Sequence, residues 1–230
     1  MEKPAPLSEC RLAPGLALIF DMDGVIIDSN PVHRQAWAAF NRRFGLEISE
    51  QMYQRTNGWR NDQIVRYFFG DSLSAEEVDA RGAAKEALYR EMIGDRIEEM
   101  LVPGVRQFLE RYRGAPMGLA TNAEPANVDF LLDRGGLRPY FRAVVDGSQV
   151  SRPKPDPEIY LRTAEMLVTA PANCIVFEDS HSGVEAAGVA NMRIVLVGTT
   201  YGDLPGSNIT IDNFFSGYLS EWLGVQRRID

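Results

Sequence analysis

A short apolar run, Leu16 to Phe20, is the first strong hydrophobic signal along the chain. Runs of this length that end in a turn are typical of buried strands in a parallel sheet. This run ends in Asp21-Met22-Asp23-Gly24, where the glycine allows a sharp turn. The functional crevice of open α/β sheets lies beyond the carboxyl ends of the strands, so we expect Asp21 and Asp23 at a site there.

The next seventy residues predict helices only. Apolar residues share one face of a predicted helix over about 31–44, and three more helical segments are expected at about 49–55, 61–69 and 75–93. Asn30-Pro31 is a start signal for the first of these helices, and Ser74-x-x-Glu77 is a capping box for the last. We therefore predict an all-helical insertion at residues 31–99, within a core formed by residues 1–30 and 100–230.

Helices and strands alternate after Pro103-Gly104. Strands are expected at 117–120, 143–145, 174–177 and 193–197. Helices are expected at 105–112, 125–133, 157–167, 182–189 and 213–223. This alternation predicts an α/β fold with a Rossmann-like parallel sheet.

Composition excludes several classes of protein. The 230 residues are 45% hydrophobic, enough for a real core, and the formal net charge of −8 argues against nucleic acid as a partner. No apolar run approaches the ~20 residues that span a bilayer, and the first 14 residues lack an export signal pattern. The two cysteines, Cys10 and Cys174, do not form a disulfide framework. We expect a cytoplasmic monomer, and the net charge still permits a small phosphorylated metabolite as a partner, because such a ligand needs only a local basic pocket.

Polar residues follow three of the predicted strands. Singly, they could be turn residues, a surface charge or a helix cap. Together, at strand ends that should meet, they favour a site. Two close carboxylates repel each other unless a cation intervenes, which suggests Mg²⁺, and flanking prolines stiffen the backbone of Lys154. The set consists of Asp21 and Asp23, Thr121 and Asn122, Lys154, and Glu178 and Asp179.

This set of residues resembles the motifs of the haloacid dehalogenase superfamily, from about Leu16 onward. Asp21-x-Asp23-Gly24 matches the first motif, Thr121 the second, Lys154 the third and Glu178-Asp179 the fourth. The helical insertion resembles the superfamily's cap domain in position. The branch that contains β-phosphoglucomutase and sugar-phosphate phosphatases is the most similar.

The resemblance implies phosphoryl transfer with Asp21 as the nucleophile, which forms an aspartyl-phosphate. It also implies that Mg²⁺ is bound by Asp21, the backbone carbonyl of Asp23 and Asp179, with Glu178 as a further ligand or a partner of the ligands. Asp23 is the implied general acid. A carboxylate at that position separates this chain from the dehalogenases, because a halide leaving group needs no proton.

The same resemblance assigns roles to other polar residues. Thr121 and Asn122 would hold phosphoryl oxygens, and Lys154 would supply fixed positive charge. His33 aligns with a hinge histidine of β-phosphoglucomutase, and Lys85 with a lysine that the mutase uses on a second phosphate. Both could equally be ordinary polar residues of helices.

The loop Asn57-Gly58-Trp59-Arg60-Asn61-Asp62 departs from the mutase pattern Lys-Gly-x-Ser-Arg-x-x-Ser. It is more similar to the sugar-phosphate phosphatases, and it makes Gly58 and Arg60 candidate substrate-binding residues. We therefore expect a Mg²⁺-dependent phosphatase acting on a small, sugar-like phosphate ester. The alternatives are a β-phosphoglucomutase-type mutase and, in another class, a catalytically silent relative that binds a ligand.

Overall fold

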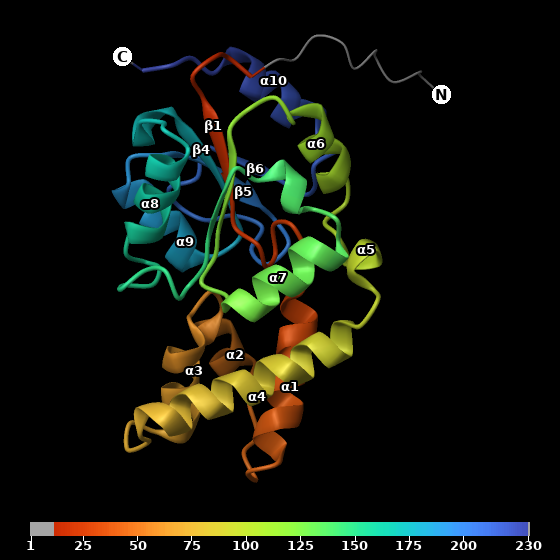
Figure 1. Cartoon of the computed structure of the whole chain (residues 1–230), viewed down its shortest axis with the longest axis vertical. Helices are drawn as coiled ribbons and strands as arrows, with labels where there is room; N and C mark the ends of the chain where they lie inside the picture. The colour runs from red at the N-terminus through yellow and green to blue at the C-terminus, as the bar shows by residue number, and fades with distance from the viewer. Residues whose placement is uncertain (1–11, 230) are drawn as a thin grey trace.

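The computed structural model describes residues 12–229, and these contain a six-stranded parallel sheet with the order β3-β2-β1-β4-β5-β6 (Figure 1). The strands are β1 (Ala17–Phe20), β2 (Met117–Ala120), β3 (Ala143–Val145), β4 (Cys174–Glu178), β5 (Arg193–Val197) and β6 (Ile209–Ile211). The predicted α/β fold is confirmed. Strand β1 lies between β2 and β4, so the three strand ends that carry polar residues are direct neighbours.

Helices cover both faces of the sheet. Side chains alternate between faces along a strand, so Leu18 and Phe20 enter one buried cluster and Ala17 and Ile19 the other. Figure 1 shows α8 and α9 on one side of the sheet and α6 and α10 on the other. The bounds are α6 (Val105–Arg111), α7 (Pro125–Arg134), α8 (Glu158–Met166), α9 (His181–Val189) and α10 (Gly217–Val225).

An aromatic pair supports the carboxyl ends of the two central strands. Phe20 of β1 and Phe177 of β4 are partners in the register, and their rings stack with centroids 4.7 Å apart. Both side chains are fully buried. Asp21 follows Phe20 and Glu178 follows Phe177, so this buried pair of rings fixes the backbone from which both acidic side chains extend.

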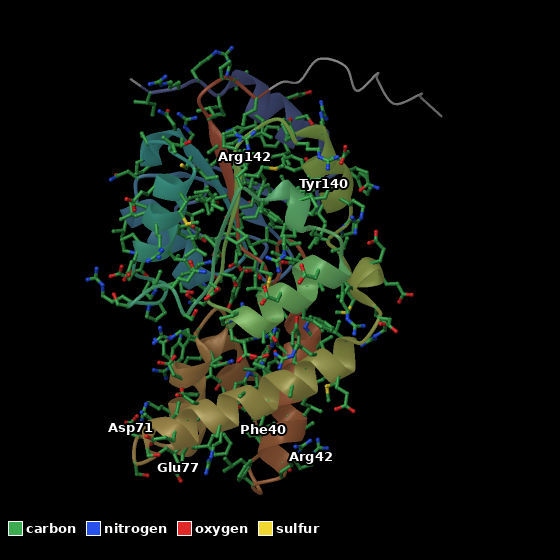
Figure 2. The ribbon with its side chains drawn as sticks, in the orientation of Figure 1. Phe40, Arg42, Asp71, Glu77, Tyr140 and Arg142 are labelled. Atoms are coloured by element: carbon green, nitrogen blue, oxygen red, sulfur yellow. The ribbon has the colours of Figure 1, made fainter. Side chains whose placement is uncertain are left out.

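Four helices form a layer beyond the carboxyl ends of the strands (Figure 1). This helical layer consists of α1 (Asn30–Arg42), α2 (Glu50–Thr56), α3 (Asn61–Phe69) and α4 (Ala75–Ile93). It has its own buried cluster, which includes Trp37, Phe40 and Val65. In Figure 2, the labelled Phe40, Arg42, Asp71 and Glu77 belong to this layer, and Tyr140 and Arg142 lie beside the sheet.

The structure differs from the predicted elements in a few places. Helix α10 begins at Gly217 rather than 213, where the Ser216 hydroxyl accepts a hydrogen bond from the Leu219 amide. Strand β6 and the short helix α5 (Ile97–Met100) were not predicted. The Ser74 capping box is present as predicted.

Two composition-based expectations can be compared with the fold. Within residues 12–229, none of the helices has the length and apolar character that crossing a membrane requires. Cys174 is buried in β4 as a free thiol, whereas Cys10 lies outside the described residues.

Candidate active site

A cavity lies between the strand ends and the helical layer. The core contributes the residues that follow β1, β2 and β4, together with Lys154, and the helical layer contributes α1, the 56–59 loop and α4. Of the predicted site residues, those that line the cavity are Asp21, Asp23, His33, Gly58, Lys85, Thr121, Asn122, Lys154 and Asp179.

Lys154 connects the ends of three strands, β1, β2 and β4. Its Nζ donates to Asp21 Oδ1 at 2.7 Å, to Glu178 Oε1 at 2.7 Å and to the carbonyl oxygen of Ala120 at 3.0 Å. The side chain is almost fully buried. Although burial opposes the charged form, Asp21 and Glu178 raise the pKa of Lys154 above its usual value, so its charge is fixed.

Asp21 lies at the centre of the sheet edge. Its backbone N–H donates to the Phe177 carbonyl at 3.0 Å, which continues the pairing of β1 with β4. Burial raises the pKa of the Asp21 carboxyl to about 7, against the lowering effect of Lys154, and the Glu178 charge adds to the increase. The Asp21 carboxyl group is thus shielded from water and lies close to another negative charge.

Glu178 is saturated with hydrogen bonds. Its Oε1 accepts from Lys154 and from the Tyr160 hydroxyl at 2.6 Å. Its Oε2 accepts from the Asp179 amide and from both the amide and the hydroxyl of Ser180, at 2.8 to 3.0 Å. A carboxylate offers about four lone-pair positions. These five donors therefore suit a residue that fixes Lys154 and the β4 end rather than one that binds a metal directly.

Asp179 is oriented by partners from two other segments. Its Oδ2 accepts from Asn30 Nδ2 at 3.0 Å and from the Thr200 hydroxyl. Gly24 passes close to this carboxylate, since a Cβ there would lie 1.9 Å from Asp179 Oδ2. The turn therefore needs glycine for close approach as well as for its φ of +79°.

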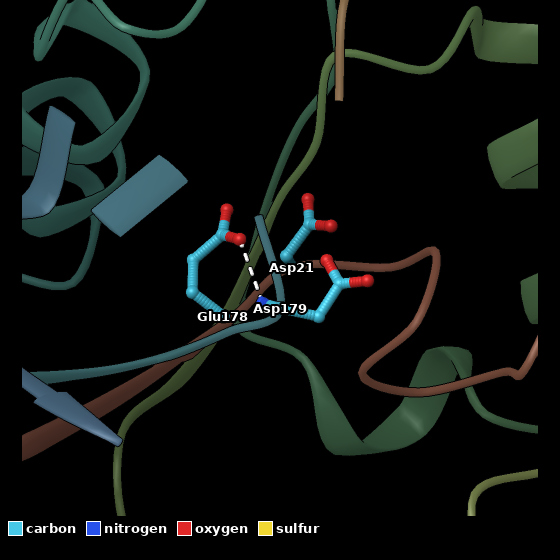
Figure 3. A group of neighbouring side chains, drawn as sticks. All are labelled: Asp21, Glu178 and Asp179. Atoms are coloured by element: carbon cyan, nitrogen blue, oxygen red, sulfur yellow. Dashed lines mark hydrogen bonds between the residues drawn. The ribbon is translucent and has the colours of Figure 1, made fainter. Parts of the chain in front are cut away.

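A hard divalent cation fits this group of residues. Oxygens of Asp21, Glu178 and Asp179 lie within 4.8 Å of one another, and Figure 3 shows the carboxyl groups of Asp21 and Asp179 side by side. Among the described residues, Lys154 is the ammonium bonded to this group. One positive charge does not balance three carboxylates, and burial with this excess charge raises the pKa of Asp179 well above its usual value.

Asp23 faces the helical layer. Its Oδ1 accepts from the Ser29 hydroxyl at 2.5 Å and lies 3.3 Å from His33 Nε2. Burial alone would raise the pKa of Asp23, but His33 and Ser29 lower it below its usual value. The Asp23 carboxylate is therefore ionised in the free protein.

His33 joins Asp23 to a buried ion pair of α4. Lys85 Nζ lies 2.6 Å from His33 Nδ1 and 2.8 Å from Glu86 Oε1. An ammonium only donates, so Nδ1 accepts and the His33 Nε2 proton points toward Asp23. Glu86 Oε2 in turn accepts from Asn127 Nδ2 of α7 at 2.7 Å.

Asn122 connects the helical layer to the core. Its Nδ2 donates to the Gly58 carbonyl at 2.8 Å, and its Oδ1 accepts from the Lys154 amide at 3.3 Å. Thr121 is buried beside it and accepts from the Ala123 amide at 3.1 Å. Both residues lie at the cavity, as expected for the end of β2.

Arg60 lies outside the cavity. Its Nε and Nη2 donate to the two oxygens of Asp62 at 2.7 and 2.8 Å, two residues along the chain. It faces a separate groove that includes Asp79 and Glu124. Of the other predicted site residues, Asn122 also lines this groove, and the role of Arg60 in substrate binding stays a prediction.

Sequence reasoning missed several residues of the site. The sequence indicates Asn30 as a helix cap, but Ser29 has that position and Asn30 is the first residue of α1. Thr200 and Tyr160 stand in unremarkable loop and helix positions. Glu86 follows a candidate lysine directly, and that adjacent opposite charge was the available signal. Its burial could not be inferred, because α4 has little amphipathic pattern.

Comparisons with known proteins agree with this geometry. The sequence profile of the haloacid dehalogenase-like hydrolases matches residues 16–191. A fructose-1-phosphate phosphatase of Escherichia coli is 36% identical over 184 residues, covering 77% of this chain and 94% of that protein. A β-phosphoglucomutase of Bacillus subtilis is 29% identical over 191 residues, covering 79% and 83%. The crystal structure of a β-phosphoglucomutase from Clostridium difficile superposes with a TM-score of 0.81 at 27% identity, covering 90% and 96%.

Proposed function

Because the chain belongs to the haloacid dehalogenase-like hydrolase family, we propose that it is a Mg²⁺-dependent phosphatase that hydrolyses a small sugar phosphate monoester. Its relatives support phosphatase or phosphotransferase activity in general. The choice between the two depends on what attacks the phosphorylated enzyme, water or a second sugar hydroxyl.

The observation that carries the proposal is the pairing of cations in the helical layer. Lys85 is bonded to Glu86 at 2.8 Å, and Arg60 is bonded to Asp62 at 2.7 Å. A mutase must hold a sugar phosphate by its second phosphate so that a hydroxyl outcompetes water. Such positioning is worth up to ~7–11 kcal/mol of barrier. Two cations that are already neutralised are poorly suited to that task.

In the proposed first step, an Asp21 oxygen forms a bond to phosphorus while the bond from phosphorus to the ester oxygen breaks. Asp23 gives the leaving oxygen its proton. Asp23 is ionised in the free protein, but the negative phosphoryl group near it raises its pKa and favours the protonated form on binding. Lys154 holds its charge next to Asp21 throughout.

In the second step, Asp23 accepts a proton from water as the water oxygen bonds to phosphorus and the Asp21–phosphorus bond breaks. Inorganic phosphate leaves, and Asp21 is restored. Asp21 and Asp179 would hold the Mg²⁺, which screens repulsion between the carboxylates and the phosphoryl group. Glu178 would fix the positions of Lys154 and the β4 end.

Product analysis tests the proposal directly. The enzyme is incubated with Mg²⁺ and a panel of phosphorylated sugars, which includes fructose 1-phosphate and β-glucose 1-phosphate with catalytic β-glucose 1,6-bisphosphate. We expect free phosphate to be the main product by phosphorus NMR. Rapid formation of glucose 6-phosphate with negligible free phosphate would favour the mutase, and no turnover of any sugar phosphate or generic aryl phosphate would favour a silent relative.

A further inference from the structure

We propose that Glu86 sets the substrate class of the cavity by excluding a second anionic group, so that the favoured substrates are monoesters of neutral sugars or polyols. This inference rests on the proposed function, because it assumes a phosphoryl group at Asp21. It assigns to Glu86 a role in specificity, not in the chemical steps.

Glu86 belongs to the wall that the helical layer contributes to the cavity. It lies on α4, lines the cavity and is 3% exposed. His33 and Lys85 lie between its carboxylate and Asp23, through contacts of 3.3, 2.6 and 2.8 Å. A substrate whose phosphoryl group is at Asp21 therefore extends its other end toward Lys85 and Glu86.

Lys85 has little capacity left for a phosphate. Its ammonium contacts Glu86 and His33 and lies 4.8 Å from the centre of the Trp37 ring and 5.6 Å from that of Tyr89. An ammonium has three donors, and two are occupied by these hydrogen bonds. A second phosphate could reach Lys85 only by displacing the Glu86 carboxylate or by lying against it.

The Glu86 carboxylate is charged at neutral pH. Burial alone would raise its pKa, but the charge of Lys85 and hydrogen bonds from Lys85 and Asn127 lower it to about 2. A phosphate placed beside it would meet a like charge in a poorly hydrated space, which is strongly unfavourable. Neutral hydroxyl groups meet no such penalty.

The same carboxylate can bind sugar hydroxyls. Oε1 accepts from Lys85 and Oε2 from Asn127, so each oxygen keeps a free acceptor position. Hydroxyl groups are donors that fit these positions. The cavity thus combines a charged end for one phosphoryl group with an acceptor end for a polyol.

The matched pair fructose 1-phosphate and fructose 1,6-bisphosphate tests the inference, because the two sugars differ by one phosphate. Phosphate release is measured for each with the wild type, Glu86→Gln and the control Glu91→Gln, an exposed position on the same helix. We expect the wild type to prefer the monophosphate at least tenfold in kcat/KM. Glu86→Gln should raise the bisphosphate-to-monophosphate ratio at least tenfold, and Glu91→Gln should leave it unchanged.

Lys85→Gln separates charge from loosened packing. It breaks the same ion pair but leaves the Glu86 charge unbalanced, so the ratio should fall below that of the wild type. If Glu86→Gln does not fold, the ratio measured for Lys85→Gln still tests the inference. Three results would overturn the inference: an unchanged ratio in folded Glu86→Gln, a raised ratio in Lys85→Gln, or no preference of the wild type for the monophosphate. None of them would contradict the proposed phosphatase activity. Failure of the wild type on every sugar monophosphate instead overturns the proposed function.

Discussion

Asn30 Nδ2 donates a hydrogen bond to Asp179 Oδ2 at 3.0 Å, across 149 positions of sequence. Asn30 begins α1, the first helix beyond the core, and Asp179 is a proposed metal ligand. The same amide group donates to the Thr200 hydroxyl at 2.8 Å, which also bonds Asp179. The start of the helical layer is thus bonded directly to the candidate metal site.

Asn30→Ala is therefore expected to weaken Mg²⁺ binding. Loss of a partner that orients a ligand typically costs ~10–100-fold in metal affinity. Isothermal titration with Mg²⁺ measures this without reference to activity, and the concentration for half-maximal phosphate release should rise in parallel. An unchanged Mg²⁺ affinity would show that Asn30 does not orient Asp179.

Asp21→Asn is expected to retain the fold and lose activity by roughly 10⁴-fold or more, as for other nucleophiles. The amide cannot form the phosphoenzyme, while Lys154 keeps its bonds to Glu178 and the Ala120 carbonyl. Removing one of three crowded carboxylates should leave the melting temperature unchanged or higher. The exposed Asp79→Asn is the control, and wild-type turnover in Asp21→Asn would refute the assignment.

Activity is expected to require Mg²⁺, and Ca²⁺ should inhibit by binding the same oxygens with longer bonds and more ligands. Because the cation relieves repulsion among Asp21, Glu178 and Asp179, it should also raise the melting temperature of the protein. Full phosphate release after exhaustive chelation, or no thermal shift with Mg²⁺, would contradict the proposed site.

The sequence predicted those elements that are determined by residues close together in the chain. Apolar runs located β1, β2 and β4, and the order of polar strand ends placed Asp21, Thr121 and Asp179 at one edge. The bounds of α3 and α4 agree with prediction, and the start of α4 was predicted from the local capping box of Ser74 and Glu77.

The interactions that could not be predicted join segments far apart in the chain. Asn30 resembles a cap until Asp179 and Thr200 are brought beside it. From the sequence, Glu86 resembles a surface residue of a charged helix. In the structure it is buried, and Asn127 of α7 donates a hydrogen bond to it.

Glu86 should contribute a distinct pH dependence to stability. Its pKa falls from 4.5 in the unfolded chain to about 2 in the folded protein. The unfolded chain therefore binds the proton first as the pH falls, so this stabilisation is complete above about pH 4.5 and is lost toward pH 2, with an upper limit of ~3 kcal/mol. Urea unfolding of wild type, Glu86→Gln and the control Glu91→Gln should show Glu86→Gln less stable at neutral pH, with the difference shrinking in acid. A constant difference would contradict the shift.

The last prediction concerns the contact between the helical layer and the core, which we propose opens and closes about hinges near 29–31 and 101–104. Gly58 lies against the β4 end, where a Cβ would be 2.8 Å from Ser182 Oγ and 3.0 Å from Ser180 Oγ. The Ser180 hydroxyl cannot easily move, because it bonds Glu178 and the Gly183 amide. Gly58→Ala should therefore hold the layer away from the core.

Gly45→Ala provides a matched control, because Gly45 has φ +72° against +77° for Gly58 but no atom within 4 Å of its Cβ position. Both variants should lose ~1–2 kcal/mol of stability from the left-handed backbone. Only Gly58→Ala should lose kcat/KM, by tenfold or more, since incomplete closure leaves Asn122 without its Gly58 partner and the site open to water. Solution scattering with a phosphate analogue should show compaction in the wild type and in Gly45→Ala but not in Gly58→Ala. Equal kinetics of the two variants would mean that this contact does not control catalysis.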